Sequence, residues 1–168
     1  MEMQTLKDLY IEQLRDLYSA ESQLVEALPK MAKAASNNQL RQSFEEHLVQ
    51  TQTQRDDVAG IIEQLGMDPG GHECQAMRGL IKEGEELLKK KAVADPDVFD
   101  AGLIAAAQRI EHYEIAGYGT VCTYAKILNE ADAERILHRI AGEEGAADQK
   151  LTQLAERVIN REAMHAAD

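Results

Sequence analysis

Six residues with metal-binding side chains lie in the middle of otherwise apolar helical stripes in this chain of 168 residues. They are Glu21, His47, Glu111, Glu114, Glu144 and Asp148. A buried carboxylate must be paired, protonated or bound to a cation, because removing its charge from water is costly. Carboxylate and imidazole ligands suit iron, manganese or zinc. The six residues therefore predict a site for one or two divalent cations, with no catalytic residues beyond the metal ligands.

The segment 108–120 shows this pattern most clearly. Its residues belong to a helical face with three- and four-residue spacing, on which Glu111 and Glu114 stand between apolar positions. Taken alone, each candidate has a simpler explanation: Glu21 as an ion-pair or dimer-contact residue, or His47 as a hydrogen-bonded core histidine. Glu144 and Asp148 form an exposed acidic face if their helix is rotated. The coincidence on four helices favours the metal site.

Five helices are expected, over residues 5–35, 38–65, 73–91, 96–129 and 132–160. Pro29 predicts a kink or a local break in the first helix, since proline lacks a backbone donor. The polar tail from about residue 161 is expected to be frayed. Short links make helices 1 and 2 one antiparallel pair and the last two helices another, and the long connection between the pairs contains its own helix. This order predicts a single all-α domain, residues 1–168, built as a ferritin-like four-helix bundle with a crossover helix.

Composition excludes several other classes of protein. The formal net charge is −12, which argues against a nucleic-acid surface built on bulk positive charge. Cys74 and Cys122 lie in no CxxC pair, so the chain lacks the pattern of a structural zinc or rubredoxin-type iron site. No apolar run approaches the length of a membrane span, and the N-terminus has no signal-peptide pattern. We therefore expect a cytoplasmic protein with reduced thiols and without membrane or nucleic-acid partners.

Four segments carry a resemblance to a known family: residues 16–21 (DLYSAE), 27–31 (ALPKM), 74–81 (CQAMRGLI) and 105–116 (AAAQRIEHYEIA). They are similar to the bacterial stress-associated YciE/YciF family of ferritin-like proteins (DUF892). The resemblance extends over nearly the whole chain, and the Glu-His-Tyr-Glu stretch is its most specific part. It implies a ferritin-like bundle, a homodimer and a di-iron carboxylate centre, and members of the family are commonly described as ferroxidase-like.

The second helix departs from the ferritin-like pattern. Ferritin-like sites usually place Glu-x-x-His on this helix, whereas here His47 is followed by Gln50 and Gln52. A neutral amide is a weaker metal ligand than a carboxylate. This difference predicts that one of the two metal positions is weak or empty.

Two functions from different classes follow from the sequence. The first is a di-metal protein that oxidises Fe(II) with oxygen or peroxide, with the six residues above as ligands of two iron ions, or of manganese or zinc. The alternative is a non-catalytic, dimeric helical stress protein whose acidic core is empty or holds one structural cation. A DNA-protecting mini-ferritin is disfavoured, because that family builds its site between subunits and no basic character marks this N-terminus.

Overall fold

Helices make up almost all of the chain. The computed structural model describes residues 3–166, and its helices are α1 (Leu6–Ala34), α2 (Asn38–Gln64), α3 (Gln75–Leu88), α4 (Pro96–Ile127), α5 (Ala131–Leu154), the π-helical turn η1 (Ala155–Ile159) and α6 (Asn160–His165). No strand occurs among these residues. The expected five helices are therefore present, with ends that differ from the predicted ones by a few residues.

Capping side chains set where three of these helices begin. The side chain of Thr5 accepts a hydrogen bond from the Asp8 backbone N–H (3.1 Å), and the Asp8 carboxylate accepts one from the Thr5 N–H (2.8 Å). This reciprocal pair satisfies donors that have no partner within α1. Asn37 and Asp95 accept from the first N–H groups of α2 and α4 in the same way. These side chains therefore supply partners for N–H groups at the starts of α1, α2 and α4.

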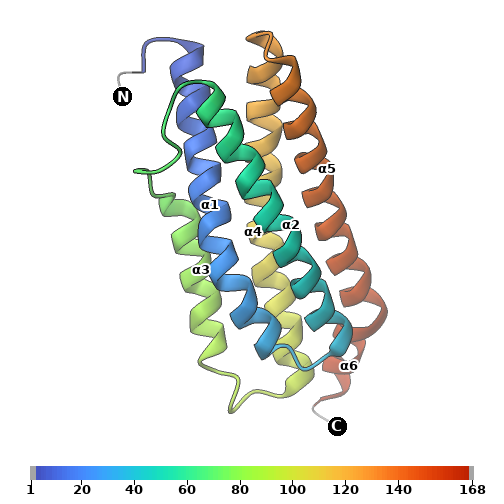
Figure 1. Cartoon of the computed structure of the whole chain (residues 1–168). Helices are drawn as coiled ribbons and strands as arrows, with labels where there is room; N and C mark the ends of the chain where they lie inside the picture. Colours follow the sequence, from blue (N-terminus) through green and yellow to red (C-terminus); the bar gives the residue numbers. More distant parts are fainter. Residues whose placement is uncertain (1–2, 167–168) are drawn as a thin grey trace.

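The four long helices form two antiparallel pairs, α1 with α2 and α4 with α5 (Figure 1). After the first pair the chain returns along the bundle through the loop 65–74 and α3, so α4 runs parallel to α2 (Figure 1). This is the predicted order of two pairs joined by a long crossover, and it differs from a simple up-and-down bundle.

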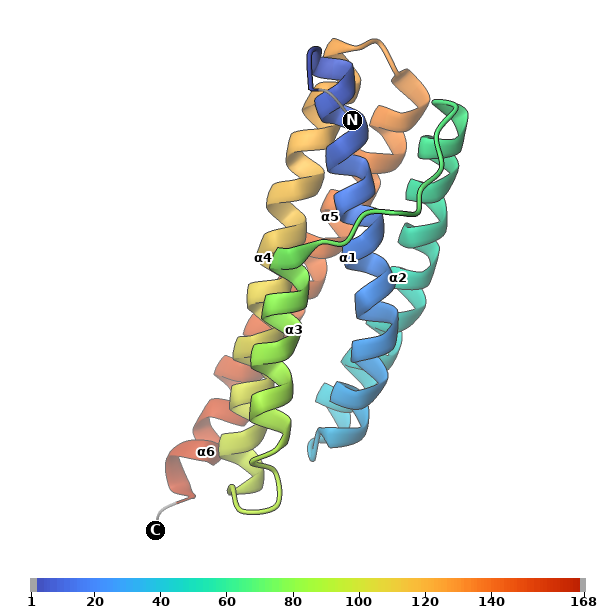
Figure 2. The same ribbon diagram turned by 90° about the vertical axis from the view of Figure 1, so that its left-hand side faces the viewer.

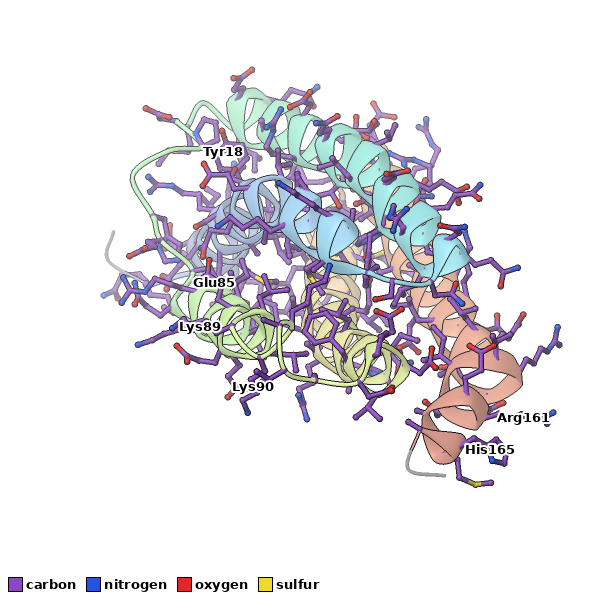
Figure 3. The ribbon with its side chains drawn as sticks, turned by 90° about the horizontal axis from the view of Figure 1, so that it is seen from below. Tyr18, Glu85, Lys89, Lys90, Arg161 and His165 are labelled. Atoms are coloured by element: carbon purple, nitrogen blue, oxygen red, sulfur yellow. The ribbon has the colours of Figure 1, made fainter. Side chains whose placement is uncertain are left out.

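The crossover covers one side of the bundle. The loop 65–74 passes across α1 before α3 begins, and α3 then packs on α1 and α4 (Figure 2). Viewed along the bundle, α3 lies outside the four long helices and away from α5 (Figure 3). At the other end of α1, the buried Asp100 carboxylate accepts hydrogen bonds from the backbone of Ser36 and Asn37, which joins the α1–α2 turn to α4.

The core has two apolar parts with a polar layer between them. One part contains residues such as Leu24, Leu28, Phe44, Phe99 and Leu103, and the other contains Tyr10, Leu14, Ile62, Val121 and Leu137. The polar layer consists of seven buried side chains: Glu21, His47, Thr51, Gln54, Glu111, Glu114 and Glu144. The stripes are therefore apolar at both ends and polar in the middle, as the spacing predicts.

Two local features differ from expectation. The helix α1 continues through Pro29 without a break, because only the backbone donor of Pro29 itself is lost. The segment after Asn160 was expected to fray, but it forms α6 after one π-helical turn. Ala155 and Ile159 of that turn are buried in the core, and this packing supports a helical end that the polar sequence alone does not predict.

Gly117 allows the close approach of α4 to α1, and its substitution by alanine is expected to destabilise the fold. A Cβ atom at this position would lie 2.7 Å from Cδ2 of Leu17, whose side chain is packed in the core. We expect Gly117→Ala to lower the free energy of unfolding by about 1–2 kcal/mol, because overpacking outweighs the gain in helix propensity.

Urea denaturation would measure this loss, and Gly119 provides the matched control. Gly119 lies two residues further along α4 and is exposed, with nothing within 4 Å of an added Cβ atom. Gly119→Ala should therefore raise the free energy of unfolding by about 0.5–1 kcal/mol. Equal effects of the two substitutions would contradict a close α1–α4 contact at Gly117.

Candidate metal centre

Four side chains from three helices converge in the polar layer. Each of His47 on α2, Glu111 and Glu114 on α4, and Glu144 on α5 offers one ligand atom, and these atoms lie within 4.8 Å of one another. The Nε2 atom of His47 is 3.3 Å from Oε1 of Glu111 and 3.8 Å from Oε2 of Glu144. All four residues are at least 94% buried, since the most accessible of them, His47, is only 6% exposed.

Most polar atoms of this cluster have no hydrogen-bond partner. Neither ring nitrogen of His47 makes a hydrogen bond, although Nε2 lies at ion-pair distance from Glu111. Both carboxylate oxygens of Glu114 and of Glu144 are also unpartnered, as is Oε2 of Glu111. Buried polar atoms in proteins are nearly always paired, so this many unpaired nitrogen and oxygen atoms in one place indicate a partner from outside the chain. A cation is the partner that satisfies an imidazole nitrogen and carboxylate oxygens together.

Burial and mutual repulsion control the protonation of the glutamates. Burial is the main cause that raises the pKa of Glu21, Glu111 and Glu114 well above the ordinary value of 4.5. The neighbouring carboxylates, including Glu144, raise the pKa of each further. Without a cation these groups hold protons to higher pH than an exposed glutamate does, whereas a bound cation favours their ionised form.

The size of the cluster fits one ion. Nitrogen and carboxylate ligands bind transition metals at about 2.0–2.2 Å, so ligand atoms on opposite sides of an ion are about 4.2 Å apart. The four atoms here lie within 4.8 Å, and small side-chain movements would bring them to that spacing. One nitrogen and three carboxylate groups form a donor set that binds iron, manganese or zinc. The cluster of four can therefore hold a metal ion.

Glu21 lies in the same buried layer but outside this group of four. One of its carboxylate oxygens accepts a hydrogen bond from the hydroxyl group of Tyr118, and the other has no partner. Both side chains are fully buried. The sequence places Tyr118 one turn from Glu114 on α4, where ordinary packing is the simpler expectation. Its pairing with a residue 97 positions away is a tertiary contact, so the helical spacing alone does not predict it.

Removal of the Tyr118 hydroxyl is expected to destabilise the protein. Tyr118→Phe keeps the ring but leaves the Glu21 carboxyl group without its hydrogen-bond donor in a fully buried position. We expect a loss of about 1–3 kcal/mol in the free energy of unfolding, measured by urea denaturation of the metal-free protein. In a Glu21→Gln background the same substitution should cost less, and an equal cost in both backgrounds would contradict the role assigned to this hydrogen bond.

Asp148, the sixth predicted ligand, lies apart from the cluster. Its carboxylate accepts a hydrogen bond from Nε2 of Gln108 (3.0 Å) and is 3.5 Å from Nε2 of His112, whose side chain is exposed. Four residues of helix rotate Asp148 by about 40° from Glu144, which is enough to direct it toward the outer side of α4. The structure thus brings four of the six predicted residues together, places Glu21 beside them, and leaves Asp148 outside.

The polar side chains that α2 places in the buried layer, apart from His47, are not the glutamines noted in the sequence. Gln50 and Gln52 are both exposed, so neither amide belongs to the buried layer. Thr51 and Gln54 are fully buried instead, and Oγ1 of Thr51 and Oε1 of Gln54 have no partner. Both residues lie on the predicted stripe of this helix, four and seven positions after His47, and that spacing is the signal by which they could have been found.

Comparison with known proteins assigns the chain to a family. Residues 5–164 match the model of a domain of unknown function, DUF892. The sequence is 42% identical to Protein YciF of Escherichia coli (strain K12), over 99% of this chain and 100% of that protein. The chain belongs to the DUF892 family. The resemblance seen in the four sequence segments is therefore confirmed over the whole domain.

Three solved structures have the same fold as this chain. The crystal structure of the E. coli stress protein YciF superposes with a TM-score of 0.89 at 43% identity, covering 94% of this chain and 99% of that one. YcfI of Rhodopseudomonas palustris gives 0.84 at 43% identity, with 90% and 95% covered. A protein of Xanthomonas campestris pv. campestris, 18% identical, gives 0.77 over 98% of this chain and 100% of that one, a likeness of fold alone. The ferritin-like arrangement is confirmed by these comparisons.

Within residues 3–166, no helix combines the length and the apolar character that a membrane crossing requires. The polar layer described above is consistent with this result, since it interrupts every long helix with polar residues near its middle.

Proposed function

We propose that this protein binds two Fe(II) ions in its polar layer and oxidises them with dioxygen or hydrogen peroxide. The observation that carries the proposal is the convergence of four buried, largely unpartnered donors, His47, Glu111, Glu114 and Glu144. Glu21, which lies in the same buried layer and whose charge acts on those of Glu114 and Glu144, would contribute to holding the second ion. Iron is a redox-active metal that this donor set can bind.

In this reaction the iron ions would supply the electrons, and the protein residues would release protons, exclude water and fix the ligand positions. When bound, the two ferrous ions supply one electron each, enough to reduce dioxygen to hydrogen peroxide or hydrogen peroxide to water. Glu21, Glu111 and Glu114 would give up protons as the ions bind, since their raised pKa values describe the metal-free state. The apolar clusters on either side of the layer would exclude bulk water and fix the ligand positions.

Metal analysis combined with oxidation kinetics tests this proposal. Purified protein would be stripped of metal, titrated with Fe(II) without oxygen, and then mixed with oxygenated or peroxide-containing buffer. We expect two Fe(II) per chain and an absorption band of ferric iron that forms faster than in protein-free buffer. Fe(II) binding at background level would refute the proposed function.

The alternative is a non-catalytic helical protein with a single structural cation. One observation favours it: α2 contributes His47, Thr51 and Gln54 to the polar layer, but no carboxylate. A two-metal site needs more anionic ligands than a one-metal site. Because α2 supplies none, it contributes less to holding a second ion than α1, α4 and α5 do. Binding of one ion per chain, with a higher melting temperature and no oxidation above background, would support this alternative.

Three further expectations concern the biological setting. The homodimer and a role in a stress response rest on the resemblance to YciF, which is described as a stress protein of E. coli. The cytoplasmic location rests on the sequence pattern. We propose that they apply to this chain. Sedimentation of the purified protein would determine the oligomeric state directly.

A further inference from the structure

A groove between α2 and α5 leads from the surface to the polar layer. Its volume is about 480 Å³, and its lining contains two members of the four-residue cluster, His47 and Glu111. Both are more than 90% buried, and the ring nitrogens of His47 and Oε2 of Glu111 have no hydrogen-bond partner. The remaining lining residues come from α2 and α5, and they include Glu46, Glu143, Ala147 and Lys150.

The other sides of the bundle are more closed. The pairs α1–α2 and α4–α5 pack together extensively, whereas α2 and α5 make fewer contacts with each other than any other neighbouring long helices do. The α1–α4 side is covered by α3, and Leu17 packs directly on Gly117 there. The cavities that border α3 include none of the four cluster residues in their linings. The α2–α5 face is therefore the side on which the cluster is approached most directly.

Charged side chains stand at the opening of this groove. Lys150 on α5 and Glu46 on α2 form an ion pair across it, with Nζ and Oε2 2.5 Å apart and each side chain about half exposed (54% and 51%). Exposed ion pairs contribute little to stability, so this connection opens readily. Glu143, on the same groove, receives hydrogen bonds from Gln54 and Arg139. A cation that arrives from solvent thus meets two carboxylates, that of Glu46 paired with Lys150 and that of Glu143 paired with Arg139.

We propose that the α2–α5 groove is the route by which a divalent cation enters the His47–Glu111–Glu114–Glu144 cluster, and that the Lys150–Glu46 pair is its gate. The inference rests on the proposed function, since it concerns the supply of the same centre. Glu46 and Glu143 are the first carboxylates on the route, and His47 and Glu111 are the cluster residues reached first, because they line the groove.

Narrowing the groove should slow metal binding without changing how much metal binds. Ala147 lines the groove and is only partly buried, so Ala147→Phe places a ring in the path while leaving every ligand in place. The probe is Co(II), whose visible absorption changes on binding and which needs no oxidant. We expect the rate of binding in stopped-flow experiments to fall by about tenfold or more, with the same final number of Co(II) per chain. The control is Ala105→Phe, an exposed alanine on α4 beside α3, which should bind at the wild-type rate.

Substitution of Lys150, which removes the ion pair at the opening, should make metal binding faster. Lys150→Gln deletes a positive charge at the opening and frees Glu46, so Co(II) should bind about two- to fivefold faster at low ionic strength, with a smaller difference in high salt. Lys30→Gln is matched in charge, because Lys30 forms an exposed ion pair with Glu85 of α3 (3.0 Å). Glu85 lies on the side of the molecule away from α2 and α5 (Figure 3), so this control should change the rate little.

The possible results distinguish failure of the proposed entry route from failure of the proposed function. If Ala147→Phe and Lys150→Gln both bind Co(II) at the wild-type rate and to the wild-type amount, the groove is not the route, while the metal centre stands. If the wild-type protein binds no Co(II) and no Fe(II), the proposed function fails and the route fails with it. Should Ala147→Phe not fold, as judged by circular dichroism, the comparison of Lys150→Gln with Lys30→Gln decides the question alone.

Discussion

Replacement of Glu114 and Glu144 by glutamine is expected to abolish Fe(II) binding at micromolar protein concentration. Both residues offer ligand atoms to the cluster, and none of their four carboxylate oxygens has a partner in the protein. Glutamine has nearly the same shape as glutamate, but its neutral amide is a weak ligand. The loss of two anionic ligands should weaken binding by about a thousandfold or more, judged from the 10–100-fold effects of losing even indirect support for a ligand. Anaerobic titration with Fe(II), followed by elemental analysis of the desalted protein, measures this change.

The control for this pair is a double substitution with the same change in charge at a remote site. Glu85→Gln with Glu86→Gln alters two exposed glutamates of α3, so it should leave Fe(II) binding unchanged. Glutamine is preferred to alanine, because alanine would add cavities to the core and confuse lost binding with lost stability. Undiminished Fe(II) binding by the Glu114→Gln, Glu144→Gln protein would exclude the cluster as the metal site.

The sequence predicted the features that depend on one helix at a time. The capping pair of Thr5 and Asp8 marks the start of α1 because both partners lie within one helical turn. The stripe spacing placed Glu111 and Glu114 in the core for the same reason, since the repeat of an α-helix fixes which residues share a face. The long connection between the pairs predicted the order of the helices, because a short loop could not have returned the chain along the bundle.

Features that depend on how two helices are rotated against each other were not predictable in this way. Asp148 shares the general side of Glu144, but the pairing with Gln108 shows that α5 is turned to direct it toward α4. A difference of a few tens of degrees decides this outcome, and it is set by packing between helices rather than by spacing within one.

The metal-free protein is expected to become less stable as the pH rises from 5 to 8. Glu21, Glu111 and Glu114 have pKa values in the folded state well above the ordinary 4.5. At a pH between the ordinary pKa of the unfolded chain and the raised pKa of the folded protein, the folded protein binds more protons than the unfolded chain. The free energy of unfolding therefore falls with increasing pH. The slope is up to about 1.4 kcal/mol per pH unit for each group that is protonated in the folded protein and ionised in the unfolded chain. For a domain of this size, one such group lowers the melting temperature by about 3–6 °C per pH unit, which differential scanning calorimetry would measure.

Other titrating groups with shifted pKa values act outside this range of pH. Asp8, Glu46, Glu73 and Glu86 have lowered pKa values because of hydrogen bonds to their carboxylates, so their contribution is lost only as the pH falls below the ordinary values of about 4. Burial raises the pKa of the Cys74 thiol above its ordinary value of 9.0, and this group therefore titrates above pH 8. The buried glutamates are accordingly the groups with shifted pKa values that produce a decline between pH 5 and 8.

Saturation with a divalent cation should remove this decline or reverse it. A bound ion replaces the protons of the buried glutamates, so its affinity rises with pH while the proton-dependent stability falls. The melting temperature with excess Co(II) should therefore stay level or increase from pH 5 to 8, and the metal-free Glu114→Gln, Glu144→Gln protein should show a flatter curve than the metal-free wild type. A metal-free wild type that grows more stable over this range would mean that the buried carboxyl groups are already ionised and paired. The cluster would then have no uncompensated negative charge for a cation to neutralise, and the physical reason for a metal at this site would be gone.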